Sequence, residues 1–221
     1  MNWICFLSIS HVNTYHYIRK VLAVILSCGN YLNGGNKQRG QAEGFGIDIL
    51  PKLKDLKTTS NTDNLLAFVV RFCINKFDEN KGTSLAKLPV PEPGDLEKCC
   101  HLDFEVEKGV CATLKKEVGE VRTRLERITE GAPEELKEPF FSIMSEFLIK
   151  AEQAVKDISV QVDDCAAKFI ECMKSYKFMP KKGKVEETKP EEFFSPWHLF
   201  AEDYKSTWKK EQVSSPAVVI Y

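Results

Sequence analysis

The chain has 221 residues, enough for one or two domains, and its hydrophobic (43%) and charged (29%) fractions are ordinary for a globular protein. Its 31 basic and 32 acidic residues leave a formal net charge of −1, which excludes a global field that would recruit nucleic acid or an acidic membrane surface. The eight cysteines form no C-x-x-C pair, so buried thiols in a reducing compartment are expected rather than disulfides.

Residues 1–17 are predicted to be a leader outside the main fold. The apolar patch from Trp3 to Ile9 is too short to span a membrane, and it lacks the basic start and small-residue cleavage site of a secretory signal. Residues 18–28 follow as a predicted buried helix. This helix is expected to end at Gly29, because glycine is a frequent helix stop.

The most informative segment is the run GNYLNGGNKQRGQAEGFG, residues 29–46. It packs six glycines and three asparagines into eighteen residues. Glycine and asparagine tolerate left-handed backbone angles and close approach of another chain, so the run predicts a specific irregular loop. Lys37 and Arg39 add two cations to it. A long charged loop beside a helix is a candidate docking surface.

Two further helices are predicted after the loop. Residues 47–56 read as a short amphipathic helix with Pro51 near its first turn. Residues 63–75 read as a mostly buried helix, because its apolar set is wide, and residues 60–63 offer N-cap choices. The proline-rich segment 88–94 then breaks regular structure, after which Asp95 can cap a new helix.

Two long heptad ladders follow. The first has apolar residues at 104, 111, 114, 118, 121, 125 and 128 and ends at the break 131–133. The second steps by three and four through 141, 144, 148, 151, 155, 158, 162, 165, 169, 172 and 176. Because only a short break joins them, they predict an antiparallel coiled-coil pair.

The end of the chain is predicted to clamp onto its body. Residues 181–190 read as a charged, mobile linker. An aromatic stripe then follows at steps of three and four, comprising Phe193, Phe194, Trp197, Phe200, Tyr204 and Trp208. Residues 212–221 read as a disordered tail. Since no strand alternation occurs, the predicted fold is all-α and elongated.

No catalytic constellation is present in the sequence. The four histidines are scattered, and the glycine run lacks the spacing of a phosphate-binding loop and follows no strand. Cys99, Cys100 and His101 have no second ligand pair at zinc spacing, so buried free thiols are favoured over a metal site. The chain is therefore expected to be neither an enzyme nor a cofactor or metal binder.

Residues 21–57, VLAVILSCGNYLNGGNKQRGQAEGFGIDILPKLKDLK, resemble the signature of the second formin-homology domain, the actin-assembling module of formins. The resemblance extends over about 18–211 and is most similar to the formin-1/formin-2 group. It implies a post-like region at 18–94, a coiled coil at 95–178 and a terminal helix at 190–211.

The resemblance also implies a function. Domains of this family nucleate actin filaments and stay on the growing barbed end as a head-to-tail dimer, so the expected partners are actin and a second formin copy, in the cytoplasm and on the cytoskeleton. Nucleic-acid binding and membrane insertion are not expected. The implied actin contacts are Lys37, Arg39 and Lys52. The loop residues implied to receive the partner formin are Gly29, Asn30, Asn33, Gly34, Gly40 and Gly44.

The sequence departs from the family pattern on its N-terminal side. The lasso, the linker and most of the knob of the family domain have no counterpart here, which predicts a partial domain. The alternatives are a coiled-coil scaffold without a role on actin, and an inactive or dominant-negative fragment that occupies the lasso of a complete formin.

Overall fold

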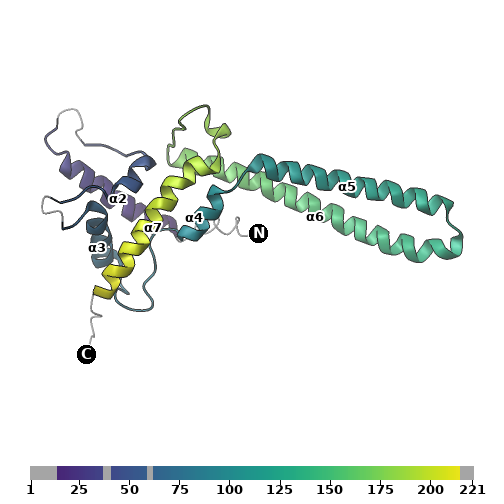
Figure 1. Cartoon of the computed structure of the whole chain (residues 1–221), viewed down its shortest axis with the longest axis horizontal. Helices are drawn as coiled ribbons and strands as arrows, with labels where there is room; N and C mark the ends of the chain where they lie inside the picture. The colour runs from purple at the N-terminus through teal and green to yellow at the C-terminus, as the bar shows by residue number, and fades with distance from the viewer. Residues whose placement is uncertain (1–13, 37–40, 59–61, 215–221) are drawn as a thin grey trace. The chain divides into compact units, whose positions relative to one another are not determined.

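The computed structural model describes residues 14–36, 41–58 and 62–214, without the side chains of residues 14–16, 134–137 and 214. These residues form helices and no strand, which confirms the predicted all-α class. The elements, labelled in Figure 1, are α2 (Thr14–Leu32), the 3₁₀ helix η1 (Ile47–Lys52), α3 (Leu65–Phe77), α4 (Pro93–Cys100), α5 (Phe104–Gly131), α6 (Glu134–Ser175), the 3₁₀ turn η2 (Val185–Glu187) and α7 (Pro190–Ser214).

The chain divides into two compact units. The first contains the described residues up to Leu102 together with those from Cys172 onward, and the second runs from Asp103 to Glu171. The predicted leader, residues 1–17, lies outside the described residues up to residue 13, and residues 14–17 belong to α2. Likewise, residues 212–214 belong to α7, and the rest of the predicted tail lies outside the description.

Helix α7 is the centre of the first unit. It packs against α3, α4 and η1, and its aromatic stripe is buried, as the sequence predicts. Five aromatic residues of the stripe are less than 9% exposed: Phe193, Phe194, Trp197, Phe200 and Tyr204. Successive rings meet edge to face, with centroids 6.4 Å apart for Trp197–Phe200 and 5.6 Å for Phe200–Tyr204, an arrangement that aromatic pairs prefer.

Local chemistry moves the predicted starts of two helices and caps a third helix at its predicted start. Helix α3 begins two residues later than expected, at Leu65, because the Asn64 side chain caps it by accepting a hydrogen bond from the Ala67 amide at 2.9 Å. Helix α4 begins at Pro93 rather than after Asp95, since proline suits the first helical position. Helix α5 is capped by Asp103, whose carboxylate accepts from the Glu105 amide at 3.0 Å.

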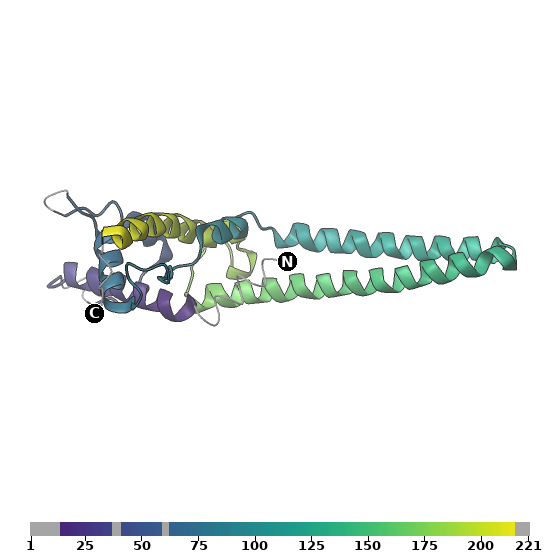
Figure 2. The same ribbon diagram turned by 90° about the horizontal axis from the view of Figure 1, so that it is seen from below.

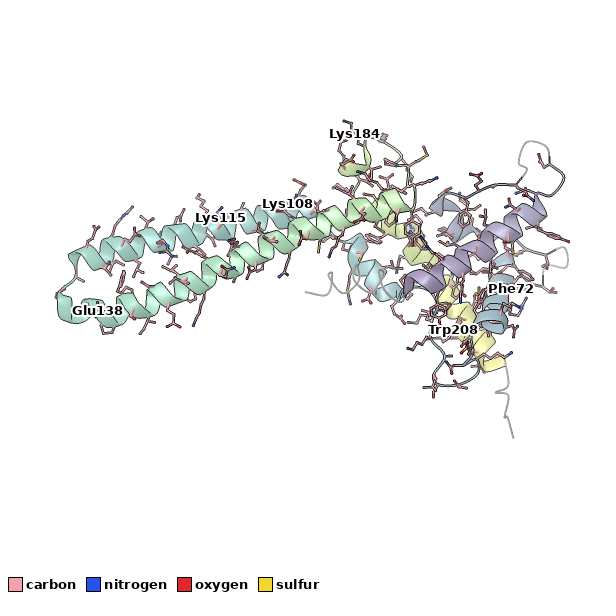
Figure 3. The ribbon with its side chains drawn as sticks, turned by 180° about the vertical axis from the view of Figure 1, so that it is seen from behind. Phe72, Lys108, Lys115, Glu138, Lys184 and Trp208 are labelled. Carbon is pink, nitrogen blue, oxygen red and sulfur yellow. The ribbon has the colours of Figure 1, made fainter. Side chains whose placement is uncertain are left out.

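Fewer apolar side chains of α3 are buried than the sequence predicts. Leu66, Val69, Val70, Cys73 and Ile74 are buried, but Phe68 and Phe72 are 49% and 41% exposed. Their rings stack on each other with centroids 6.3 Å apart on the outer face of the helix. Figure 3 labels Phe72 on this helix.

The second unit is an antiparallel helical hairpin, as predicted. Its two helices run side by side in Figures 1 and 2, and Figure 3 labels Lys108 and Lys115 on α5 and Glu138 near the turn. In the contacts between the two helices, higher residue numbers on α5 pair with lower residue numbers on α6, as antiparallel helices require. These contacts are the Phe104–Phe169 ring pair (5.8 Å), the Lys108–Asp163 ion pair (3.3 Å) and the Arg122–Glu152 ion pair (2.6 Å).

The buried stripe of the hairpin differs from the predicted seam on α5. Cys111 and Leu125 are buried as expected, but Thr129 is buried in place of Ile128, which is 56% exposed. Thr129 is accommodated because its hydroxyl donates to the carbonyl of Leu125 at 2.9 Å. A single partner helix covers only a narrow stripe of α5, so three of the seven residues in its predicted apolar ladder stay exposed: Leu114, Val121 and Ile128.

Two predicted segments are structured differently. The helix 93–100, which the sequence assigned to the coiled coil, packs on α7 in the first unit. The predicted mobile linker 181–190 contains η2 and is tied to its neighbours by the Lys174–Glu186 ion pair at 2.9 Å. The Lys181 amide also donates to the Glu192 carboxylate at 2.8 Å, so the lysine-rich segment follows a defined path.

The aromatic core predicts a strong dependence of stability on Phe200, which is 1% exposed. We expect Phe200→Ala to lower the free energy of unfolding by about 3–5 kcal/mol, because truncation leaves a cavity between its ring partners. Urea titration followed by tryptophan fluorescence measures this change. The control is Leu199→Ala, one residue away and 47% exposed, which should cost less than about 1 kcal/mol. Equal losses in the two variants would contradict the packing described for α7.

Candidate functional site

The glycine- and asparagine-rich loop begins later than the sequence predicts. Helix α2 does not stop at Gly29 but continues to Leu32. The Asn33 amide donates to the Gly29 carbonyl at 3.0 Å, and the Gly34 amide donates to the Tyr31 carbonyl at 3.1 Å. Glycine is a permitted helix stop rather than an obligatory one, and here the backbone carries on through it.

Asn30 closes the loop by a two-point hydrogen bond to a residue twelve positions further on. Its side-chain nitrogen donates to the carbonyl of Ala42 at 3.0 Å, and its side-chain oxygen accepts from the Ala42 amide at 2.7 Å. The side-chain amide thus satisfies both backbone polar groups of one residue, as a neighbouring antiparallel strand would. We refer to this pair as the Asn30–Ala42 latch. It makes Asn30 a structural residue of the predicted docking loop.

The other predicted docking residues have different local surroundings, so glycine or asparagine has a different structural role at each position. A Cβ at Gly34 would lie 3.0 Å from the Tyr31 carbonyl oxygen, so glycine lets the chain pass close to the end of α2. At Gly29 and Gly44 a Cβ would meet nothing within 4 Å. The Asn33 carbonyl accepts from the Asn36 amide at 3.1 Å, which starts the turn. Gly40 lies outside the described residues.

Among the described residues of the loop, Gly35 is the one whose backbone conformation requires glycine, and the sequence pattern did not single it out. Its φ of +83° lies in the left-handed region, where a side chain costs roughly 1–2 kcal/mol. Nothing in the pattern distinguishes Gly35 from Gly34, because both belong to the same Gly-Gly pair. The partner of the latch, Ala42, was also missed, since it takes part through its backbone alone.

The loop leads into η1, which differs from the predicted helix 47–56. Regular structure ends at Lys52 and is 3₁₀ rather than α, with Leu53 donating its amide to the Leu50 carbonyl at 3.4 Å. Pro51 lies inside the element, where it has no amide hydrogen to offer and disfavours an α-helical turn. Ile47, Leu50 and Leu53 are buried and hold this segment on α7.

The cations near the loop have different environments. Lys52 pairs with Asp48 at 3.1 Å, and both side chains are well exposed, at 63% and 76%. Lys54 is instead bound to Asp203 of α7 at 2.8 Å, and the hydrogen bond and charge of Asp203 raise the pKa of Lys54. Lys37 and Arg39, the other two predicted actin contacts, lie outside the described residues. Of the three predicted cations, the structure therefore places Lys52 alone.

Exposed apolar side chains flank the loop on both sides. Tyr31 and Leu32, at the end of α2, are 85% and 67% exposed, and Leu56, after η1, is 49% exposed. Sequence periodicity did not single them out, because they follow an apolar helix. Large apolar side chains left in water beside a shaped loop are a usual sign of a protein–protein contact.

Other features of the described residues offer little chemistry. A cavity of about 110 Å³ lies between α2, α3 and α7, with Lys20, Val21, Ile74, Phe77 and Trp208 among its lining residues. No group of three or more His, Cys, Asp or Glu side chains in the described ranges could hold a metal ion. Burial raises the pKa of the Cys73 thiol to about 11 and that of Cys99 to about 12, so both stay protonated at neutral pH.

Among the helices of the described part of the chain, none combines the length and apolar character needed to cross a bilayer. Comparison with known proteins then decides the family. The profile of the Formin Homology 2 Domain matches residues 8–205. The chain belongs to the formin homology 2 family. The resemblance that the sequence showed around residues 21–57 is thus confirmed.

The chain is also similar to several curated proteins. The chain is 38% identical over 197 residues to Formin-2 of Homo sapiens, covering 88% of this chain and 11% of that protein. It is 39% identical over 201 residues to Protein cappuccino of Drosophila melanogaster, covering 89% and 19%. For Formin-1 of Homo sapiens the identity is 34% over 194 residues, covering 88% and 14%. The chain therefore spans less than a fifth of the length of these relatives.

The latch predicts the behaviour of the formin homology 2 loop on substitution. We expect Asn30→Ala to speed hydrogen exchange of the Ala42 amide about tenfold or more, because that amide loses its protein acceptor while the helices remain folded. Exchange followed by nuclear magnetic resonance measures it. Asn33→Ala, at the same end of α2, is the matched control and should leave Ala42 exchange unchanged. Unaltered exchange in Asn30→Ala would rule out the latch.

Proposed function

We propose that this chain is an actin-binding module that acts at the barbed end of actin filaments. The observation that carries the proposal is the formin homology 2 match over residues 8–205, which includes the whole loop and η1. Nucleation of filaments and processive capping of their growing ends belong to the same proposal. So does a location in the cytoplasm, on the actin cytoskeleton.

The charged side of the proposed contact is Lys37, Arg39 and Lys52. Lys52 supports this role because its ion pair with Asp48 is solvent-exposed, and exposed pairs contribute only about 0–1 kcal/mol. Exchanging Asp48 for an acidic group of a partner therefore costs little. Lys54 is less suited, since it is already bound to Asp203 on the helix that holds η1 in place.

The second contact is the docking of another formin copy on the loop. The proposed receiving surface consists of the predicted loop residues together with Tyr31 and Leu32. The Asn30–Ala42 latch supports it, because it fixes the two ends of the loop relative to each other and so lowers the conformational entropy that these ends lose when a partner binds. The open space above Gly29 and Gly44 leaves room for a partner backbone to approach.

Charge removal tests the actin contact. We expect the triple variant Lys37→Ala, Arg39→Ala, Lys52→Ala to weaken binding to filament barbed ends at least about tenfold, because three cations near acidic groups each contribute a fraction of a kcal/mol or more. Pyrene-actin elongation from preformed filament seeds, titrated with the chain, measures the affinity. Far-ultraviolet circular dichroism should show unchanged helicity.

The control removes the same charge from another exposed segment. Lys181→Ala, Lys182→Ala and Lys184→Ala, all at exposed positions, should leave barbed-end affinity within about twofold of the wild type. Equal weakening by both triple variants would mean that net charge, not the loop, drives binding. A wild-type chain with no effect on elongation would overturn the actin proposal and favour the scaffold or inactive-fragment alternatives.

A further inference from the structure

Asn33 and Gly34 form an Asn-Gly dipeptide within the loop. The sequence contains no second Asn-Gly pair and no Asp-Gly pair. In such a pair the backbone nitrogen of the glycine can reach the side-chain carbonyl carbon of the preceding residue, because glycine has no Cβ to obstruct the approach and adopts many backbone conformations. The one dipeptide of this reactive kind therefore lies within the predicted docking surface.

The side-chain amide of Asn33 is not held by the fold. It is partly exposed, and no hydrogen bond of this side chain is found among the described residues. Asn30 has both polar atoms of its side chain bound in the latch, and it is followed by tyrosine rather than glycine. Asn36, the third asparagine of the loop, is followed by lysine. Asn33 is thus the loop asparagine in which an unrestrained amide precedes a glycine.

The reaction open to this pair converts an amide into an acid. The backbone nitrogen of Gly34 forms a bond to Cγ of Asn33, the Cγ–Nδ2 bond breaks, and the Gly34 amide proton leaves with the side-chain nitrogen as ammonia. The product is a cyclic imide, which water opens at either of its carbonyl carbons. One opening gives aspartate. The other gives isoaspartate, in which the backbone runs through Cγ. Water is the co-reactant, and nothing is oxidised or reduced.

The end of α2 controls access to this reaction. The Gly34 amide donates to the Tyr31 carbonyl at 3.1 Å, so the attacking nitrogen is engaged in the turn that ends the helix. The reaction therefore proceeds from the fraction of molecules in which this turn is open. Helix ends fray, which makes such opening easier here than in the middle of α2. The latch opposes it, because it ties Asn30 at the same helix end to Ala42.

The product changes both the charge and the backbone of the loop. Either ring opening leaves a carboxylate at position 33, close in sequence to Lys37 and Arg39. Isoaspartate also lengthens the backbone inside the turn in which the Asn33 carbonyl accepts from the Asn36 amide at 3.1 Å. An added anion beside two cations weakens the attraction of the loop for an acidic partner. This last consequence rests on the proposed function, whereas the conversion itself does not.

We propose that Asn33 is a site of spontaneous amide-to-acid conversion and that the Asn30–Ala42 latch sets its rate. The loop thus contains a chemical change that accumulates with the age of the chain. A young chain presents Lys37 and Arg39 beside a neutral amide, and an aged chain presents them beside a carboxylate. The latch delays the change, because it lowers the population of the open turn.

Peptide mass spectrometry of the full chain, aged at neutral pH and body temperature, tests the site and the latch. Fragmentation that distinguishes aspartate from isoaspartate should find both at position 33, formed at least about tenfold faster than acid at Asn30 or Asn36. Asn30→Ala should speed conversion of Asn33 at least about threefold, because the turn opens more often. Equal rates at the three asparagines would overturn the site. An unchanged Asn33 rate in Asn30→Ala would overturn the role of the latch.

A matched pair of variants tests the consequence for actin. Asn33→Asp carries the charge of the aged chain from the start, and Asn33→Gln keeps a neutral amide whose attack would need a larger ring. In the filament-seed elongation assay, Asn33→Asp should weaken barbed-end affinity about fivefold, and Asn33→Gln should leave it within about twofold of the wild type. Equal affinities of the two variants would overturn the effect on actin. A wild-type chain inactive in this assay would overturn the proposed function instead, and the mass-spectrometric result would still decide the conversion.

Discussion

Burial of one aromatic stripe holds the first unit together. Phe193, Phe200 and Tyr204 are at most 1% exposed, and α7, which carries them, is the element against which α3, α4 and η1 all pack. Fully buried aromatic side chains contribute several kcal/mol each, more than any exposed ion pair on this surface. The position of η1 follows from this core, because Leu50 and Leu53 anchor it on α7. The core therefore determines where Lys52 is presented.

The loop is held at both of its ends by different forces. At one end the Asn30 side chain makes two hydrogen bonds to the backbone of Ala42, and at the other the apolar side chains of η1 are buried. A segment fixed in this way can contain several glycines and still keep a defined entry and exit. The sequence predicted that a shaped loop exists here. It could not predict the latch, because half of that contact is a backbone group common to every residue.

Periodicity gave the helices correctly where a long apolar pattern specified them, as in α6 and α7. It failed where a local cap or a tertiary contact decides. Asn64 caps α3, while Asp63, the residue expected to lie at the helix start, binds Arg71 in an ion pair. In the hairpin, the heptad pattern predicts that Ile128 is buried and that Thr129 is not. The structure buries Thr129 instead, which is tolerated because its hydroxyl donates to a carbonyl within the helix. Sequence alone does not show how many partner helices share an apolar ladder, and that number sets the width of the buried stripe.

The net charge of the chain, like its apolar pattern, does not show how individual side chains are arranged. A formal net charge of −1 describes the chain as a whole, but cations a few residues apart are available to a partner to very different degrees. Lys54 is bound to the α7 carboxylate of Asp203, so releasing it would disturb the contact that helps to fix η1. Lys52 has its ion pair in solvent, where salt and water already compete with Asp48. A charged partner therefore competes most easily for a cation such as Lys52, whose ion pair lies in solvent and does not tie η1 to α7.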